Sequence, residues 1–120
     1  MSVRIYHNPS CGKSRATLAA IRAHGIKPEI IEYLRTPPDR DTLLGLLAGL
    51  GISPRALLRS CQPDYMALGL DDPALPDDRL IEAMLAHPVL IERPIVVAPG
   101  GIRICRPPER VLELLASVGT

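Results

Sequence analysis

The sequence predicts a domain of the mixed α/β class, and three observations indicate it. A strand-like run, Val3–Tyr6, is followed by a helical pattern and a second strand-like run. Further on, Ile95–Ala98 is apolar at every position, which is typical of a strand covered on both faces. The 120 residues are 47% hydrophobic, enough for one domain with a core. With no Trp, no Phe and three Tyr, that core must consist of Leu, Ile and Val.

The N-terminal part is predicted to form a strand–helix–strand unit. The helix spans Ala16–His24, and Gly25 suits its C-terminal cap. The second strand covers Lys27–Leu34, with apolar members at Ile30, Ile31 and Tyr33. A connection of this length predicts a parallel strand pair joined by a right-handed crossover.

The middle of the chain is predicted to be helical. Thr36–Pro38 ends the second strand, and Asp39 and Asp41 suit the first turn of a helix. Helices are expected from there to Leu50 before Gly51, from the Ser53–Pro54 cap to Arg59, and from Asp77 to Leu85 before His87–Pro88, with a short turn within Asp64–Leu70. Their apolar positions, spaced as on one helix face, are Leu43, Leu46, Leu47, Leu50, Leu80, Ile81, Met84 and Leu85.

The C-terminal part is predicted to be strand–strand–helix. Pro99–Gly101 turns the chain, Ile102–Cys105 returns as an antiparallel strand, and Pro107–Glu109 opens a helix. That helix has Val111, Leu114, Leu115 and Val118 on one face. The sum is a single thioredoxin-like α/β sandwich, residues 1–120, with its core at about 1–36 and 88–120 and a helical insertion at about 37–87.

Composition excludes several classes of function. The net charge of +1 argues against a nucleic-acid partner or an acidic membrane surface. The N-terminus lacks a signal-peptide pattern, and Pro, Gly or charged residues interrupt every apolar stretch, so a cytoplasmic protein is expected. Three widely spaced Cys, without metal-ligand spacing or a Gly-rich nucleotide motif, predict reduced thiols, no metal and no tightly bound cofactor.

Cys11 is the candidate reactive residue. It stands where the first strand passes into the first helix, and unpaired N–H groups and the helix dipole at such a position favour an anion. A thiol there ionises more readily than a free one, and the same N–H groups can hold an oxyanion substrate. The alternative is that Cys11 is a small apolar residue in a tight turn.

Residues His7–Arg15, which read His-Asn-Pro-Ser-Cys-Gly-Lys-Ser-Arg, closely resemble the active-site segment of the glutaredoxin-coupled arsenate reductases. The resemblance covers nearly the whole chain. It continues through Tyr33–Pro38, Gly51–Arg59, Asp77–Ile81, His87–Val97 and Arg103–Glu109.

This resemblance implies reduction of arsenate to arsenite through a covalent adduct on Cys11, with glutathione as co-substrate and glutaredoxin as the partner that reduces the mixed disulfide. It implies that Arg59, Arg93 and Arg106 hold arsenate. Several guanidinium groups suit a tetrahedral oxyanion because each offers a planar, permanently charged fork of donors. Thioredoxin-like folds place a cis proline before the buried strand, so the resemblance also implies a cis bond at Arg93–Pro94.

Residues around Cys11 have supporting roles in this interpretation. His7 tunes the thiolate or relays a proton, or else is a polar strand end satisfied by the backbone. Ser14 and Arg15 are candidates to orient Cys11, beside Gly12. Because Ser14 stands where a second Cys would give a dithiol, an outside thiol is needed unless Cys61 or Cys105 can reach the adduct.

Cys61 and Cys105 are each either a resolving thiol or an idle one. Two further functions stay open. One is a monothiol oxidoreductase of unknown substrate, acting on glutathione mixed disulfides. The other is a redox adaptor that binds a protein partner.

Overall fold

The computed structural model describes residues 3–105 and 110–115. The chain divides into two compact units: a sheet unit of residues 1–36 and 93–120, and a helical unit of residues 37–92. The helical unit continues past His87 because Leu58 and Ile91 form an antiparallel bridge and the Glu92 N–H donates to the Leu57 carbonyl at 2.9 Å. That the two units together form one domain stays a prediction.

The sheet unit contains four strands in the order β2-β1-β3-β4. They are β1 (Arg4–Tyr6), β2 (Glu29–Ile31), β3 (Ile95–Ala98) and β4 (Gly101–Ile104). β1 pairs with β2 in parallel, whereas β3 pairs antiparallel with both β1 and β4. The predicted parallel crossover and the predicted antiparallel return are therefore both confirmed.

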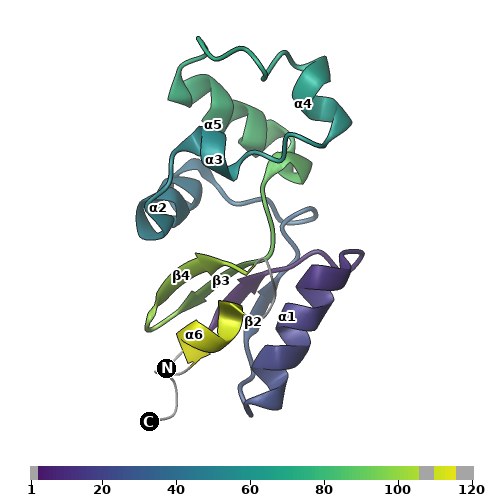
Figure 1. The fold of residues 1–120 in the computed structure, drawn as a ribbon, viewed down its shortest axis with the longest axis vertical. Helices are drawn as coiled ribbons and strands as arrows, with labels where there is room; N and C mark the ends of the chain where they lie inside the picture. Colours follow the sequence, from purple (N-terminus) through teal and green to yellow (C-terminus); the bar gives the residue numbers. More distant parts are fainter. Residues whose placement is uncertain (1–2, 106–109, 116–120) are drawn as a thin grey trace. The chain divides into compact units, whose positions relative to one another are not determined.

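Two helices pack on one face of this sheet, α1 (Gly12–Ala23) and α6 (Val111–Leu115), as Figure 1 shows. Their apolar side chains meet those of β1 and β3 in one buried cluster. It consists of Val3, Ile5, Leu18, Ile21, Val96, Ala98, Cys105, Val111, Leu114 and Leu115. Leu, Ile and Val make up most of this cluster, as expected from the composition, together with Ala98 and Cys105.

Some predicted boundaries in the sheet unit are wrong. α1 begins at Gly12, four residues before the predicted Ala16, so the first helical turn includes Ser14 and Arg15. β2 is only three residues long, and Ile30 is 38% exposed because β2 lies at the edge of the sheet, paired only with β1. Residues Pro107–Glu109 and Val118, which were assigned to the last helix, lie outside the described residues.

The helical unit contains α2 (Arg40–Leu50), α3 (Pro54–Leu57), α4 (Pro63–Ala67), α5 (Asp77–Ala86) and the 3₁₀ turn η1 (Pro88–Leu90). The predicted Ser53 cap is present, and Asp39, predicted to lie in the first turn of the helix, is the N-cap residue of α2. The Asp39 carboxylate accepts from the Thr42 N–H at 2.8 Å, and the Ser53 hydroxyl accepts from the Ala56 N–H at 3.3 Å. Gly51 ends α2 with a φ of 68°, a left-handed conformation that favours glycine. α3 ends at Leu57 rather than at the predicted Arg59, because Leu58 enters the bridge to Ile91.

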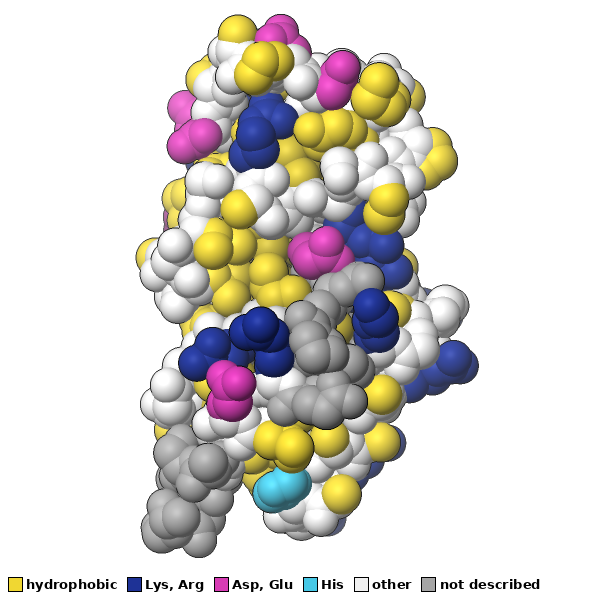
Figure 2. All heavy atoms as spheres, viewed as in Figure 1, with side chains coloured by type: hydrophobic (Ala, Val, Ile, Leu, Met, Phe, Trp, Pro, Cys, Tyr) yellow, Lys and Arg dark blue, Asp and Glu magenta, His cyan; other side chains and the backbone are white. Residues whose placement is uncertain are grey.

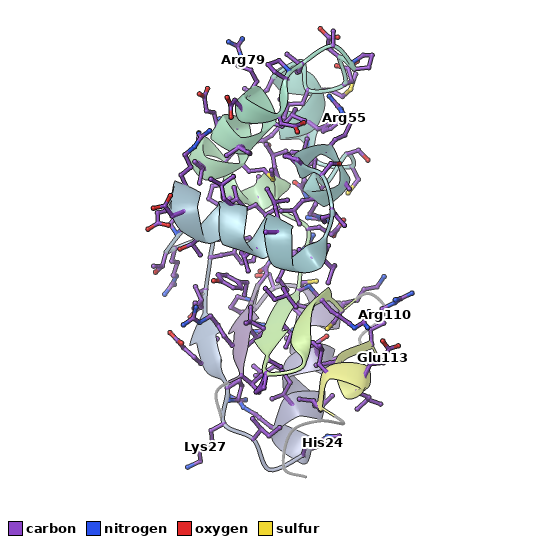
Figure 3. All side chains as sticks on the ribbon, turned by 90° about the vertical axis from the view of Figure 1, so that its left-hand side faces the viewer. His24, Lys27, Arg55, Arg79, Arg110 and Glu113 are labelled. Atoms are coloured by element: carbon purple, nitrogen blue, oxygen red, sulfur yellow. The ribbon has the colours of Figure 1, made fainter. Side chains whose placement is uncertain are left out.

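Arg55 connects the segments around α4. Its guanidinium (Arg55 is labelled in Figure 3) donates to the Tyr65 hydroxyl at 3.1 Å and to the carbonyls of Leu70 and Asp72 at 2.9 and 2.8 Å. These bonds satisfy carbonyls in a stretch with little regular structure. Hydrophobic side chains also reach the surface of this unit (Figure 2), among them Met66 and Leu68.

None of the helices in the described part of the chain combines the length and the hydrophobicity that crossing a membrane requires.

The helical unit offers a matched pair for testing the core. Met84 on α5 is fully buried, whereas Met66 on α4 is 63% exposed. Met84→Ala should lower the free energy of unfolding by about 2–5 kcal/mol, because it removes buried apolar atoms and leaves a cavity. Met66→Ala should change it by about 0.5 kcal/mol or less. Urea unfolding followed by circular dichroism measures both, and equal shifts would contradict this packing.

Candidate functional site

Cys11 lies at the junction of the loop after β1 and the start of α1. It is the N-cap residue, in an extended conformation (φ −98°, ψ 121°), and its carbonyl accepts from the Arg15 N–H at 3.0 Å. The Cys11 side chain makes no capping hydrogen bond at this helix end, and the first turn contains no acidic residue. The N–H groups of that turn are therefore available to an anion next to the half-buried sulfur.

Asn8 shapes the loop that carries Cys11, a role that the sequence analysis missed. Its side-chain oxygen accepts from the Ser10 N–H at 3.0 Å, and its carbonyl accepts from the Cys11 N–H at 3.0 Å. Asn followed by Pro-Ser is a turn-initiating signal, because the Asn side chain accepts from the backbone two residues on. That signal was present in the sequence and could have identified Asn8.

A buried hydrogen bond joins the two sides of this loop. His7 Nδ1 lies 2.7 Å from Ser14 Oγ, and the Asn8 N–H also donates to Ser14 Oγ at 3.1 Å. Ser14 is fully buried and His7 is 6% exposed. The His7 N–H donates to the Ile31 carbonyl at 2.8 Å, so both the backbone and the ring of His7 are engaged. Within the described residues, His7 contacts Ser14 by a hydrogen bond and makes none to Cys11.

The environment of His7 favours the neutral imidazole. Burial lowers the pKa of His7, and the positive charges of Arg22 and Arg15 lower it further, while the Glu32 carboxylate opposes them. A neutral ring shares one proton with Ser14: either the hydroxyl donates to Nδ1, or Nδ1–H donates to Oγ. The His7–Ser14 pair is thus an uncharged connection directly behind the Cys11 turn.

The strand register brings Arg93 and Pro94 to the same end of the sheet as the Cys11 loop. Tyr6 pairs with Ile95 in the antiparallel β1–β3 ladder, so the residues after Tyr6 and those before Ile95 leave the sheet at one end. The peptide bond between Arg93 and Pro94 is cis, as the resemblance implied. Pro94 is buried, and Arg93 is half-buried.

Arg59 belongs to the helical unit, whereas Cys11 and Arg93 belong to the sheet unit. The Arg59 side chain is only 10% exposed. Its Nε lies 3.5 Å from a Glu92 carboxylate oxygen, and its Nη2 donates to Cys61 Sγ at 3.6 Å. Arg106, the third predicted arsenate ligand, lies outside the described residues.

The two other cysteines have different environments. Cys105 is completely buried, and its N–H donates to the Pro94 carbonyl at 2.9 Å. Burial raises the pKa of the Cys105 thiol to about 12, so this sulfur stays protonated at neutral pH. Cys61 is exposed. Of the two interpretations of Cys105, the structure favours an idle, core-filling thiol.

Among the residues that the structure describes, no group of three or more His, Cys, Asp or Glu side chains is arranged to hold a metal ion.

His24 lies at the opposite end of α1 from Cys11 (Figure 3), where its ring contacts the Ala20 carbonyl at 3.1 Å.

The lowered pKa of His7 predicts how stability depends on pH. Between that value and about 6.5, the unfolded chain binds more protons at this position than the folded one, so stability increases with pH. Acidification from about pH 7.5 to 5.5, above the range in which most carboxylates titrate, should destabilise the protein. His7→Gln should reduce this slope in urea unfolding. An unchanged slope would show that His7 is not the group responsible.

Selective labelling tests the assignment of the cysteines. In the native protein at about pH 8, iodoacetamide should modify Cys61 at least about a hundredfold faster than Cys105, because Cys105 is buried and its thiol remains protonated. Peptide mass mapping resolves the two sites, and urea-unfolded protein is the control in which both should react. Comparable native rates would contradict the burial of Cys105.

Comparison with known proteins adds independent information. The model of the ArsC family matches residues 6–114. The arsenate reductase of Escherichia coli strain K12 is 58% identical over 114 residues, which are 95% of this chain and 81% of that protein. The protein YfgD of the same strain, described as uncharacterized, is 51% identical and covers 94% of this chain and 96% of its own length.

The fold also agrees with a solved structure. The arsenate reductase from Vibrio cholerae superposes with a TM-score of 0.92 at 52% identity, covering 96% of this chain and 98% of that one. The predicted thioredoxin-like α/β fold class is therefore confirmed. A family model that spans most of the chain, together with relatives more than half identical to it, shows that this protein belongs to the ArsC family.

Proposed function

We propose that this protein reduces arsenate to arsenite, with Cys11 as the nucleophile and with glutathione and glutaredoxin as electron donors. The observation that carries the proposal is the position of Cys11: a half-buried sulfur at the uncapped N-terminus of α1. The name of the E. coli relative and that of the V. cholerae structure support arsenate as the substrate. The reaction needs reduced thiols, which the cytoplasm supplies.

In the first step, the Cys11 thiolate attacks the arsenic of dihydrogen arsenate. A sulfur–arsenic bond forms, an arsenic–oxygen bond breaks, and hydroxide leaves. The backbone N–H groups of the first turn of α1 stabilise the negative charge on the oxygens of the adduct. The lack of an acidic residue in that turn favours binding of an anion there.

Arginines provide the remaining positive charge around the substrate. Arg93 supports this role because the strand register brings it to the end of the sheet where the Cys11 loop lies. Arg59 and Arg106 are proposed on the family motif alone. Arg59 is paired with Glu92 through Nε in this structure, so arsenate would bind the other N–H groups of that guanidinium or displace the carboxylate.

In the second step, a glutathione thiolate attacks the Cys11 sulfur of the adduct. A disulfide forms between Cys11 and glutathione, and the sulfur–arsenic bond breaks with both electrons remaining on arsenic. Arsenic(V) is thereby reduced to arsenic(III), which takes up protons and leaves as arsenite. Glutaredoxin then reduces the mixed disulfide and regenerates the Cys11 thiol.

The scheme uses an outside thiol because the sheet unit offers Cys11 no second reactive thiol. Ser14 occupies the position of a resolving Cys, and Cys105 is held protonated in the core. In this scheme His7 acts through its hydrogen bond to Ser14 and not by direct contact with Cys11. The hydrogen bond between the neutral ring and the Ser14 hydroxyl positions the first turn of α1.

Arsenite release by the pure full-length protein, supplied with arsenate, glutathione and glutaredoxin, tests the proposal. Cys11→Ser should lower the rate at least about a thousandfold, because it removes the nucleophile. Arg93→Ala should lower kcat/KM for arsenate about a hundredfold, because it removes an oxyanion donor. Arg22→Ala, a change of an exposed Arg in the last turn of α1, is the matched control and should leave the rate unchanged.

The same variants separate this function from the alternatives. A monothiol oxidoreductase needs Cys11 but not Arg93. If the protein had that function, Arg93→Ala would still exchange glutathione mixed disulfides, and the wild type would not reduce arsenate. A protein partner captured equally well by Cys11→Ser would indicate an adaptor. Arsenite release that survives Cys11→Ser would overturn the proposal.

A further inference from the structure

Arg15 lies beside the candidate nucleophile on the outer surface of α1. It follows Cys11 by four residues, so the two positions are one helical turn apart on the same face. Its side chain leans toward the start of the helix: Nη2 lies 3.7 Å from the point where a Cβ atom on Gly12 would stand. The guanidinium therefore covers the residue that directly follows Cys11.

No neighbour among the described residues neutralises the charge of Arg15. The side chain is exposed, and among the described residues no hydrogen bond or ion pair holds its guanidinium. The first turn of α1 contains no acidic residue, and the exposed Lys13 adds a second positive charge. The effect of Arg15 on the pKa of His7 is consistent with a positive charge close to the loop.

The second thiol of the proposed reaction must reach the Cys11 sulfur from solvent, and Arg15 is an exposed cation one helical turn along α1 from Cys11. Glutathione has two carboxylates and one ammonium group at neutral pH, so it arrives as an anion. In glutathione, the glycine carboxylate is one residue away from the cysteine thiol. The distance between these two groups is comparable to the 5.4 Å pitch of an α-helix. A planar guanidinium is the side chain best suited to hold a carboxylate.

We propose that Arg15 binds a carboxylate of glutathione and so positions its sulfur in line with Cys11, making Arg15 a specificity-determining residue for the thiol co-substrate. This inference rests on the proposed function for the identity of the co-substrate. It assigns Arg15 to recognition of the incoming thiol, whereas the arsenate itself is held by the α1 amides and the other arginines.

Thiolation of Cys11 by two disulfides, in the absence of arsenate, tests the inference. In each reaction the Cys11 thiolate attacks one sulfur, a new disulfide forms, and the other half leaves as a thiolate. Glutathione disulfide carries carboxylates, whereas 2-hydroxyethyl disulfide carries no charge. Peptide mass mapping follows Cys11 separately from the exposed Cys61.

Arg15→Ala should slow the reaction with glutathione disulfide by about three- to fivefold, the range expected of an exposed ion pair, and leave the reaction with the neutral disulfide unchanged. Arg15→Lys should recover part of the loss. Arg22→Ala is the matched control, because position 22 lies on the same face of α1 about 10 Å further along the axis. Added salt should diminish the difference between wild type and Arg15→Ala.

An equal slowing of both disulfides by Arg15→Ala would overturn the inference, since Arg15 would then act on the reactivity of Cys11 itself. So would no slowing of either, or the same loss in Arg22→Ala. Because arsenate is absent from this assay, failure of the proposed function appears separately, as a wild type that releases no arsenite. In the complete reaction, Arg15→Ala should raise KM for glutathione and leave KM for arsenate unchanged.

Discussion

The hydrogen bond between His7 Nδ1 and Ser14 Oγ is the interaction on which the candidate site depends. It joins the end of β1 to the first turn of α1 at a distance of 2.7 Å and is buried from solvent. The Asn8 N–H donates to the same hydroxyl, so one oxygen holds both the strand end and the loop. Breaking this bond would leave buried polar groups without partners, which costs free energy. The bond therefore fixes the position of the Cys11 turn relative to the sheet.

The sheet completes the site by bringing distant segments of the sequence to one end. β1 leads into the Cys11 loop, and the antiparallel β3 begins at that same end, after Arg93 and Pro94. The Cys105 N–H bonds to the Pro94 carbonyl, so the end of β4 is held there too. The aliphatic cluster beneath α1 and α6 supports this arrangement and accounts for the buried, protonated thiol of Cys105.

Most of the architecture could be predicted because local pattern and tertiary structure agree. The all-apolar Ile95–Ala98 is a central strand, and the Ser53 cap begins a helix as expected. The predicted boundaries are wrong where tertiary contacts, rather than the local sequence, determine where an element begins or ends. The start of α1 was missed because residues Gly12–Arg15 have no apolar periodicity, and β2 is short because only three of its residues find partners in β1. In the site, Cys11 and His7 follow from position and motif, whereas the contacts of Ser14 with His7 and Asn8 depend on a loop conformation that spacing alone does not define.

The burial of Ser14 also bears on how this protein could evolve. Its side chain is fully enclosed, and its oxygen has two partners at hydrogen-bond distance. A cysteine in its place would lose a strong acceptor and bring a larger sulfur into closed space, so a self-reducing pair is not one substitution away. In the proposed cycle, turnover therefore remains tied to a diffusible electron supply, and the rate of arsenate reduction follows the concentration of outside thiols.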